Sequence, residues 1–253
     1  MADPAPVHAA AQLLSDAAHV FVLAGAGMGT ESGIPDFRGP DGLWTRNPQA
    51  QRMFDLDAYR ADAQLRSDAW RMRMASEIRT SRPNAGHGSI AAWEGKRRVT
   101  VATQNIDGLQ QRAGSSEVLE LHGSYWESMC LDCDDRRPIS EVFARVESGD
   151  PDPTCEDCGG ILKTGTVAFG QALPIQTWTA AQEAAMACDI AFAIGSTLTV
   201  QPAASLATLA VQGGSPLVVI NGDPTHADAG ADVVIHDRIG PTLTLITQAL
   251  ADR

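Results

Sequence analysis

The chain has 253 residues, of which 44% are hydrophobic and 20% charged, which predicts a globular protein with a large core and excludes a disordered or fibrous chain. Its 19 Lys and Arg against 31 Asp and Glu give a net charge of −12, which disfavours direct binding to nucleic acid because the phosphates would be repelled. No apolar run reaches the roughly 18 residues of a membrane helix, and the first residues show no secretory signal, so we expect no membrane contact and a cytoplasmic location.

Apolar periodicity predicts helices that alternate with short buried strands. Residues 7–18 place apolar side chains on one helical face, and residues 19–24 then form an apolar run typical of a buried strand. Further strands are predicted at 98–102 and 118–121. The last third predicts a helix at 175–187, a strand at 190–194, a helix at 202–210, strands at 217–220 and 233–235, and a closing helix from about Pro241. This alternation predicts an α/β fold with a doubly wound, Rossmann-like parallel sheet.

Four of the five cysteines form two pairs. Cys130 and Cys133 are separated by 21 residues from Cys155 and Cys158. This Cys-x-x-Cys spacing predicts a zinc tetrathiolate, and four thiolates leave no open position, so the metal would be structural. A reactive dithiol is the alternative. Cys188 stands alone and is predicted to be a buried small hydrophobe.

Two segments interrupt the alternation. Residues 36–83 are rich in Arg, Asp, Met and Gln, and residues 124–164 hold the paired cysteines. We expect a helical module at 36–83 and a zinc-ribbon module at 124–164 to form a smaller inserted domain. Residues 1–35, 84–123 and 165–253 would then form the larger Rossmann-like domain.

Glycines follow the first predicted strand directly. Residues 25–29 read Gly-Ala-Gly-Met-Gly, and glycines at such a strand end let backbone N–H groups approach a phosphate. Thr30 stands where the last glycine of the dinucleotide fingerprint would be, so a plain tight turn is the alternative. In the loop beyond, Arg38 could hold phosphate or ribose oxygens, and Phe37 could screen a reactive intermediate from water.

Polar side chains also follow the next two strands. Residues 103–107 read Thr-Gln-Asn-Ile-Asp after the strand that ends at Ala102, and His122 follows the strand that ends at Leu121. Carboxyl ends of parallel strands are where such folds bind ligands. His122 is a plausible general base near neutral pH, although taken singly it would more often be a structural histidine.

Together these segments resemble one family, the sirtuins, over nearly the whole chain. The matching segments, in the order seen in that family, are residues 25–38 (GAGMGTESGIPDFR), Thr103–Asp107, His122–Gly123, the two cysteine pairs, Phe169–Gly170, Gly195–Thr197 and Ile220–Asn221. The resemblance implies an NAD-dependent protein-lysine deacylase, most simply a deacetylase. Its co-substrate would be NAD, its structural metal zinc, and its partners acyl-lysine proteins or peptides.

In the implied reaction, the acyl amide oxygen attacks the anomeric carbon of the nicotinamide ribose and expels nicotinamide. His122 then acts as general base on a ribose hydroxyl, and the products are free lysine and O-acyl-ADP-ribose. Asn105 would orient the ribose and a water, and Asp107 would hold the carboxamide. The NAD-binding set implied by position is Gly25, Ala26, Gly27, Asp36, Phe37, Arg38, Gln104, Asn105, Ile106, Asp107, Gly195, Ser196, Thr197, Asn221 and Ile239. The implied substrate set, which would pair as a strand with the peptide backbone, is Val167, Ala168, Phe169 and Gly170.

Two positions depart from the family pattern. Gly29 stands where a serine is usual, and Gln171 stands where a glutamate usually follows Phe-Gly. Neither holds an assigned chemical role, so rate, substrate preference and residual ADP-ribosyl transfer stay open. The alternatives are a protein ADP-ribosyltransferase, an NAD-binding or zinc-ribbon module without turnover, and a hydride-transfer dehydrogenase. The presence of Asn105, Asp107 and His122 favours the deacylase, because a mere binder need not keep a base.

The acyl preference depends on residues 70–74. Trp70 and Arg73 share a helix face and resemble the Tyr-x-x-Arg pair of sirtuins that prefer succinyl or malonyl lysine. The tyrosine hydroxyl is absent here, and Met72 and Met74 add apolar lining. The alternative is that Trp70 packs inside the helical module and Arg73 is solvated. We therefore expect acetyl or another uncharged acyl group to be the better substrate.

Overall fold

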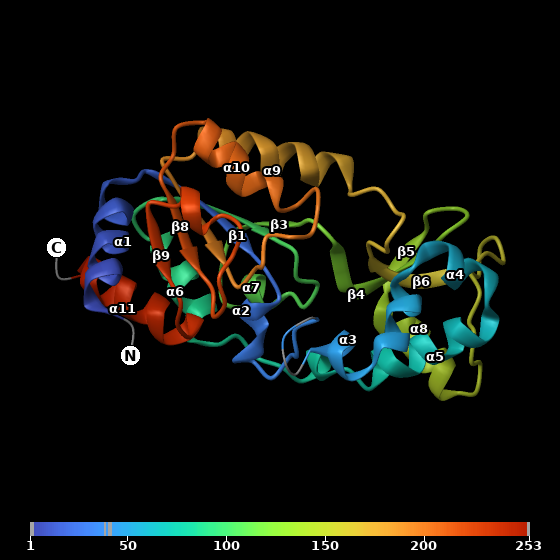
Figure 1. The fold of residues 1–253 in the computed structure, drawn as a ribbon. Helices are drawn as coiled ribbons and strands as arrows, with labels where there is room; N and C mark the ends of the chain where they lie inside the picture. Colours follow the sequence, from blue (N-terminus) through green and yellow to red (C-terminus); the bar gives the residue numbers. More distant parts are fainter. Residues whose placement is uncertain (1–2, 38, 40–41, 252–253) are drawn as a thin grey trace.

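The computed structural model describes residues 3–37, 39 and 42–251. Its larger sheet has six strands in the order β3-β2-β1-β7-β8-β9, all paired in parallel (Figure 1). The strand order reverses on the two sides of β1, which is where doubly wound folds open a ligand crevice. The strands are β1 His19–Ala24, β2 Arg98–Thr103, β3 Glu117–Glu120, β7 Ile190–Ile194, β8 Leu217–Ile220 and β9 Val233–Ile235. The predicted α/β, Rossmann-like fold is confirmed.

Helices cover both faces of this sheet. Val20 and Val22 of β1 point into one core with the helices α1 (Pro4–Asp16), α6 (Ala85–Trp93) and α11 (Ile239–Ala251). Phe21 and Leu23 point to the opposite face, against α9 (Ile175–Ala187) and α10 (Ser205–Gln212). Side chains of a strand alternate between faces, so the unbroken apolar run of β1 serves two cores at once.

The strands lie within a residue of their predicted positions, but three helices begin elsewhere. The helix predicted at 7–18 is α1, which spans Pro4–Asp16. Residues 201–204 form a turn, so α10 begins at Ser205 rather than at Pro202. The closing helix α11 begins at Ile239, two residues before Pro241. There the Glu31 carboxylate accepts the N–H of Gly240 at 3.1 Å. This cap comes from a residue distant in sequence, so no local pattern predicts it.

A second, antiparallel sheet lies beside the first, in the order β5-β4-β6. It consists of β4 (Gly123–Cys130), β5 (Arg136–Pro138) and β6 (Leu162–Thr166), with α8 (Ile139–Glu147) packed on β4. The sequence analysis placed a zinc module here but did not predict strands. The reason is visible in β6, which is buried along its whole length although it reads Leu-Lys-Thr-Gly-Thr.

The inserted segment after β1 is helical, as predicted. Its elements are α3 (Leu43–Arg46), the 3₁₀ helix η1 (Pro48–Phe54), α4 (Leu56–Ala61), α5 (Ala63–Met74) and the 3₁₀ helix η2 (Glu77–Arg79). Trp70 of α5 packs against Phe143 of α8 and shares a core with Tyr125 of β4. Arg66 and Asp152 add an ion pair of 2.7 Å between the helical segment and the cysteine-bearing segment. These two segments therefore pack together at one end of the molecule (Figure 1).

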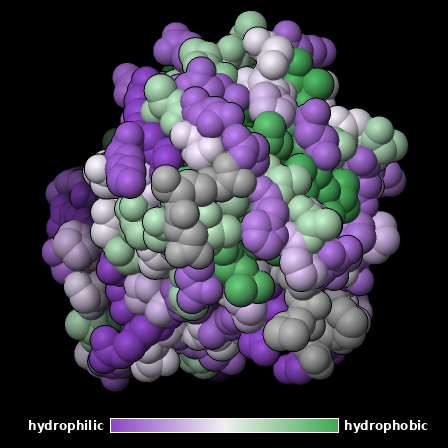
Figure 2. Space-filling model, turned by 90° about the vertical axis from the view of Figure 1, so that its left-hand side faces the viewer, coloured by the Kyte–Doolittle hydropathy of each residue, from purple (hydrophilic) through white to green (hydrophobic). Residues whose placement is uncertain are grey.

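The remaining short elements are α2 (Gly27–Thr30), α7 (Leu109–Arg112) and η3 (Asp228–Gly230). Figure 2 shows the opposite end of the molecule, where α1 and α11 lie; hydrophilic residues cover most of it and hydrophobic ones appear in small groups. Across the described residues, every helix is too short or too polar to cross a bilayer.

Candidate functional site

A cleft of about 1110 Å³ opens at the carboxyl edge of the parallel sheet, where the small sheet and the helical insert face it. Strand register explains why predicted residues meet there. Ala24 lies opposite both Thr103 and Ile194, so Gly25, Gln104 and Gly195 are the first residues beyond three neighbouring strands. The predicted residues that line the cleft are Ala26, Gly27, Asp36, Phe37, Gln104, Asn105, Ile106, Asp107, His122, Val167, Ala168, Phe169, Gly170, Gly195, Ser196, Thr197, Asn221 and Ile239. Arg38 lies outside the described residues.

Gly25 lies behind the wall of the cleft, where β1 and β7 end against each other. A Cβ on Gly25 would stand 2.6 Å from the carbonyl oxygen of Gly195. Gly195 has a φ of +63°, and a Cβ there would stand 2.5 Å from the amide nitrogen of Met28. Both positions require glycine, because a side chain would push the two backbones apart. The backbone of Gly25 and Gly195 is therefore free of side chains, and a dinucleotide can approach it closely.

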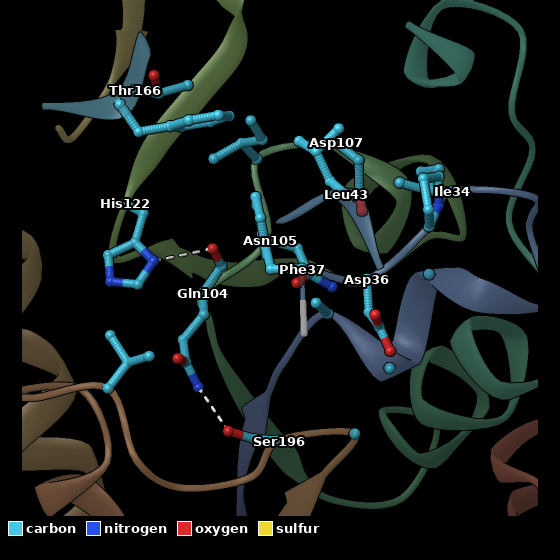
Figure 3. Close-up of a pocket in the computed structure, with 18 of the residues that line it drawn as sticks. Ile34, Asp36, Phe37, Leu43, Gln104, Asn105, Asp107, His122, Thr166 and Ser196 are labelled. Atoms are coloured by element: carbon cyan, nitrogen blue, oxygen red, sulfur yellow. Dashed lines mark hydrogen bonds between the residues drawn. The ribbon is translucent and has the colours of Figure 1, made fainter. Parts of the chain in front are cut away.

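Gln104 and Asn105 are each held by a backbone or hydroxyl partner. The Gln104 amide donates to Ser196 Oγ at 3.0 Å (Figure 3). The Asn105 amide donates to the carbonyl of Gly25 at 3.0 Å, which leaves its side-chain oxygen as an acceptor. These bonds fix polar groups from β2 against the ends of β1 and β7, and such fixed donors and acceptors suit ribose hydroxyls.

His122 is oriented by one hydrogen bond. Its Nδ1 lies 3.0 Å from the carbonyl oxygen of Gln104 (Figure 3). A carbonyl only accepts, so Nδ1 carries the proton, and in the neutral ring Nε2 is then the basic nitrogen. Burial lowers the pKa of His122 below its ordinary value, and the bond to Gln104 opposes this in part. The ring is therefore neutral near pH 7, in the tautomer that a general base needs.

Asp107, in the loop after β2, is a buried carboxylate that also lines the cleft. One oxygen accepts the N–H of Leu109 at 2.8 Å, and the other lies 3.6 Å from where a Cβ on Gly29 would stand. Burial raises the pKa of Asp107, while the bond from Leu109 and the charge of Arg112 lower it. The Trp126 indole also donates to the carbonyl of Asp107 at 2.7 Å, which fixes the backbone there. A primary amide would find a rigid acceptor at this carboxylate.

Aromatic side chains close the cleft on the side of the helical insert. The Phe37 ring lies 4.8 Å from Trp44 and 5.9 Å from Phe54, and Trp44 lies 5.7 Å from Phe169 (centroid distances). Phe37 and Phe169 were predicted from the sequence as site residues, whereas Trp44 and Phe54 were not. No motif marks these two, because they stand in a segment without apolar periodicity and reach the site only through the tertiary fold.

The segment 167–170 continues from the end of β6. The N–H of Val167 donates to the carbonyl of His122 at 2.8 Å, and the N–H of Phe169 donates to that of Phe54 at 2.7 Å. Between them, the N–H of Ala168 donates to the side-chain oxygen of Gln171 at 3.2 Å. The segment is thus bonded along one edge to His122, the residue before β4, and to η1, and Gln171 closes a turn on the other. Sequence reasoning noted Gln171 only as a departure and did not predict this contact.

The four paired cysteines converge, as predicted. Their sulfur atoms all lie within 4.8 Å of one another, with Cys130–Cys158 at 3.5 Å and Cys133–Cys155 at 3.7 Å. Tetrahedral Zn–S bonds of about 2.3 Å place sulfurs about 3.8 Å apart, whereas a disulfide needs about 2.05 Å. The cluster therefore fits a structural zinc ion. It lies outside the cleft, and Cys188 is separately buried in the core under α9.

The pair Trp70 and Arg73 is not brought together at the cleft. Trp70 is 1% exposed and packs within the small core, as the alternative interpretation expected. Arg73 does line the cleft, and its guanidinium lies 4.7 Å from the centroid of Phe54 instead of being solvated. Burial lowers the pKa of Arg73. A cation thus faces the cleft without a second donor from Trp70.

A parallel sheet whose strand order reverses at β1, with bare glycine backbone at that point, is typical of nucleotide-binding α/β proteins. The four converging cysteines add a site for a structural metal. The sequence profile of the Sir2 family matches residues 25–202. The NAD-dependent protein deacetylase 2 of Streptomyces coelicolor is 45% identical over 236 residues, which cover 91% of this chain and 97% of that protein. The chain belongs to the Sir2 family, the NAD-dependent protein deacetylases and deacylases.

Solved structures agree with this assignment. A Sir2 enzyme studied for its mechanism and regulation superposes with a TM-score of 0.88 at 37% identity, covering 98% of both chains. Sir2 proteins bound to an acetylated and to a propionylated peptide give TM-scores of 0.82 and 0.83 at 29% and 30% identity. Each of these covers 94% of this chain and 95% of the other.

Proposed function

We propose that this chain removes acyl groups, acetyl best, from lysine side chains of proteins or peptides bound in the cleft beside NAD. The observation that carries the proposal is the contact of 3.0 Å between His122 Nδ1 and the carbonyl oxygen of Gln104. Because a carbonyl only accepts, Nδ1 donates and Nε2 is left to take a proton. Relatives that bind acetylated and propionylated peptides support the substrate class.

NAD supplies a ribose carbon that becomes electrophilic as nicotinamide departs. In our proposal Asp107 accepts a hydrogen bond from the carboxamide, and Asn105 presents its side-chain oxygen to the ribose or to water. His122 accepts the proton of a ribose hydroxyl once nicotinamide has left. The dinucleotide is held by the bare backbone of Gly25 and Gly195 and by a set of residues around it. These are Ala26, Gly27, Asp36, Phe37, Ser196, Thr197, Asn221 and Ile239, and Arg38 remains part of this proposed set.

The acyl-lysine peptide is proposed to lie along residues 167–170. Val167 and Phe169 direct their N–H groups to His122 and Phe54, so Ala168, between them, faces the other edge. A peptide that pairs there as a strand must take the place of the Gln171 side chain at the N–H of Ala168. Gln171 therefore competes with substrate for one hydrogen bond.

The two-domain division is part of the same proposal. Residues 1–35, 84–123 and 165–253 bind NAD, and the modules at 36–83 and 124–164 form the small domain. None of the five cysteines, all of which the structure describes, forms a disulfide, and a zinc tetrathiolate suits a reducing compartment, so we also propose a cytoplasmic location.

The proposal is tested with wild type, His122→Ala and, as control, His8→Ala, since His8 is exposed on α1. Each protein is incubated with NAD and an acetyl-lysine peptide, and deacetylation is followed by mass spectrometry. Loss of a general base costs about 10²–10⁴-fold, so H122A should fall by that factor while H8A keeps the wild-type rate. A peptide that gains ADP-ribose instead of losing acetyl would contradict the proposal and favour the transferase.

A further inference from the structure

Lys163 is a buried lysine. The chain has only two lysines, and while Lys96 is exposed, Lys163 in β6 is 4% exposed. A buried ammonium group is costly unless it is paired and hydrogen-bonded. Among the described residues, no carboxylate pairs with Lys163, and the charges that act on it are the cations Arg73 of α5 and Arg136 of β5. Burial of this amine therefore costs free energy that no ion pair offsets, which indicates another role for Lys163.

The hydrogen bonds of the Lys163 amine are to main-chain carbonyl groups. Its Nζ donates to the carbonyl of Thr164 at 2.8 Å and to that of Thr166 through a shorter bond, and Met129 Sδ lies 3.8 Å away. Burial, together with the charges of Arg73 and Arg136, lowers the pKa of Lys163 to about 7. Neutral or charged, the amine keeps N–H donors for both carbonyls.

The two carbonyls lie where the β4–β6 ladder is irregular. Gly123 pairs with Thr166 and Ser128 with Thr164, so five steps along β4 correspond to only two along β6. Such a bulge interrupts regular pairing and re-aims the strand that follows it. The amine of Lys163 bridges the carbonyls at this interruption from within the same strand.

The strand end that Lys163 fixes leads directly into the site. Val167 follows Thr166, and its N–H donates to the carbonyl of His122 at 2.8 Å. A small cavity of about 20 Å³ beside Lys163 is also lined by Val167 and Ala168. Displacement of the Thr166 carbonyl would therefore move both the proposed peptide-pairing segment and the backbone of the proposed base.

We propose that Lys163 is a positioning residue for deacylation: by bridging the carbonyls of Thr164 and Thr166 it sets the backbone that receives the peptide and carries His122. This inference rests on the proposed roles of segment 167–170 and His122. It predicts that loss of the amine impairs use of the acyl-lysine peptide and leaves NAD binding intact, since the contacts of Lys163 are with Met129, Thr164 and Thr166, none of which is proposed to bind the dinucleotide.

The test compares Lys163→Met and Lys163→Arg with wild type, and Lys96→Met is the matched control. K163M should raise the KM for an acetyl-lysine peptide about tenfold, since a misplacement of about 1 Å can cost up to 10²-fold. Its NAD affinity by calorimetry, zinc content and melting temperature should stay near wild type. K163R, which keeps a cation and N–H donors, should recover much of the lost kcat/KM, and K96M should behave as wild type.

An unchanged peptide KM in K163M would overturn the proposal. So would equal losses in NAD affinity and peptide use with a lowered melting temperature, which would mark Lys163 as merely structural. If K163M does not fold, Lys163→Gln, which keeps an amide donor but no cation, is measured in its place with the same two outcomes. Failure of the proposed function itself is recognised separately, because wild type would then not deacylate the peptide.

Discussion

At the scale of the residue, a single backbone carbonyl decides what His122 can do. The sequence predicts a histidine at a strand end but cannot say which nitrogen is protonated. The register of β2 and β3 brings the carbonyl of Gln104 within 3.0 Å of Nδ1, and this selects the tautomer. From sequence alone, His122 could also have been a structural histidine. The sequence could not decide this, because the partner of Nδ1 is a main-chain carbonyl, which every residue has.

The pH dependence of turnover follows from this environment. The base form of His122 must be neutral, and burial lowers its pKa below the ordinary 6.5. The acid limb of kcat/KM for an acetylated peptide should therefore have its midpoint below pH 6.5, since kcat/KM reports groups of the free enzyme. A midpoint above pH 6.5 that disappears in H122A would contradict the assignment of a desolvated neutral imidazole.

Asp107 should control how the nicotinamide group binds. Asp107→Asn removes the charge from a buried acceptor, and a hydrogen bond to a charged group is worth about 1.5–3 kcal/mol, or roughly tenfold or more. We expect a higher KM for NAD and weaker inhibition by nicotinamide, because both present the same carboxamide. Asp57→Asn, at an exposed position of α4, is the control. Unchanged nicotinamide inhibition in D107N would contradict this role and show that Asp107 serves only to accept the N–H of Leu109.

At the scale of the element, the small sheet depends on its metal. β4 ends at Cys130, and the loop from Cys155 to Cys158 leads into β6, so the four sulfurs tie both strands together. Arg137 reinforces this end through ion pairs to Asp135 at 2.7 Å and Glu156 at 2.8 Å. Exposed pairs of this kind contribute little by themselves, so we attribute the order of the module chiefly to zinc.

Zinc loss should therefore act on activity through folding. Cys155→Ala, or chelation of the wild type, should release zinc, loosen the small sheet and abolish deacylation, because metal binding and folding are coupled in such sites. Cys188→Ala, in the core under α9, should keep its zinc. Metal content by mass spectrometry and far-UV circular dichroism measure both effects. A metal-free, folded and fully active sample would refute this account.

The elements also divide by how well the sequence predicts them. The central strands β1, β7 and β8 of the larger sheet are almost continuous apolar runs buried on both faces, and their positions followed from that pattern. β6 could not be predicted in the same way, because its buried positions include Lys163 and two threonines whose partners come from the same strand and its neighbour β4. Tertiary contacts similarly set the start of α11.

At the scale of the whole molecule, the cleft is lined by side chains from the larger sheet and from the helical insert. The strand ends of the larger sheet supply the polar residues that motifs mark, and these were predicted. The helical insert supplies Trp44 and Phe54, which no motif marks, and Arg73, which was predicted only by its likeness to an acid-recognising pair. The chemistry of the site was therefore predictable from sequence, whereas the shape of its acyl side depends on how the insert packs against the sheet.

This packing bears on the acyl group that the enzyme prefers. Arg73 faces the cleft over Phe54, but Trp70 is buried and cannot assist it in binding a distal carboxylate. We expect kcat/KM to be higher for acetyl-lysine than for succinyl-lysine in one peptide. Arg71→Met, at the exposed neighbouring position, is the control for Arg73→Met. A succinyl preference above about tenfold, lost in R73M but kept in R71M, would show that Arg73 alone suffices for bidentate recognition of an acid.

In the proposed reaction, acyl removal is coupled to consumption of NAD in this cleft. One measurement tests it most directly: the quantities of nicotinamide, deacetylated peptide and acetylated ADP-ribose formed in a single reaction with limiting NAD. We expect equal amounts of the three, with the acetyl group carried on ADP-ribose. Release of free acetate without nicotinamide, or nicotinamide without deacetylated peptide, would contradict it.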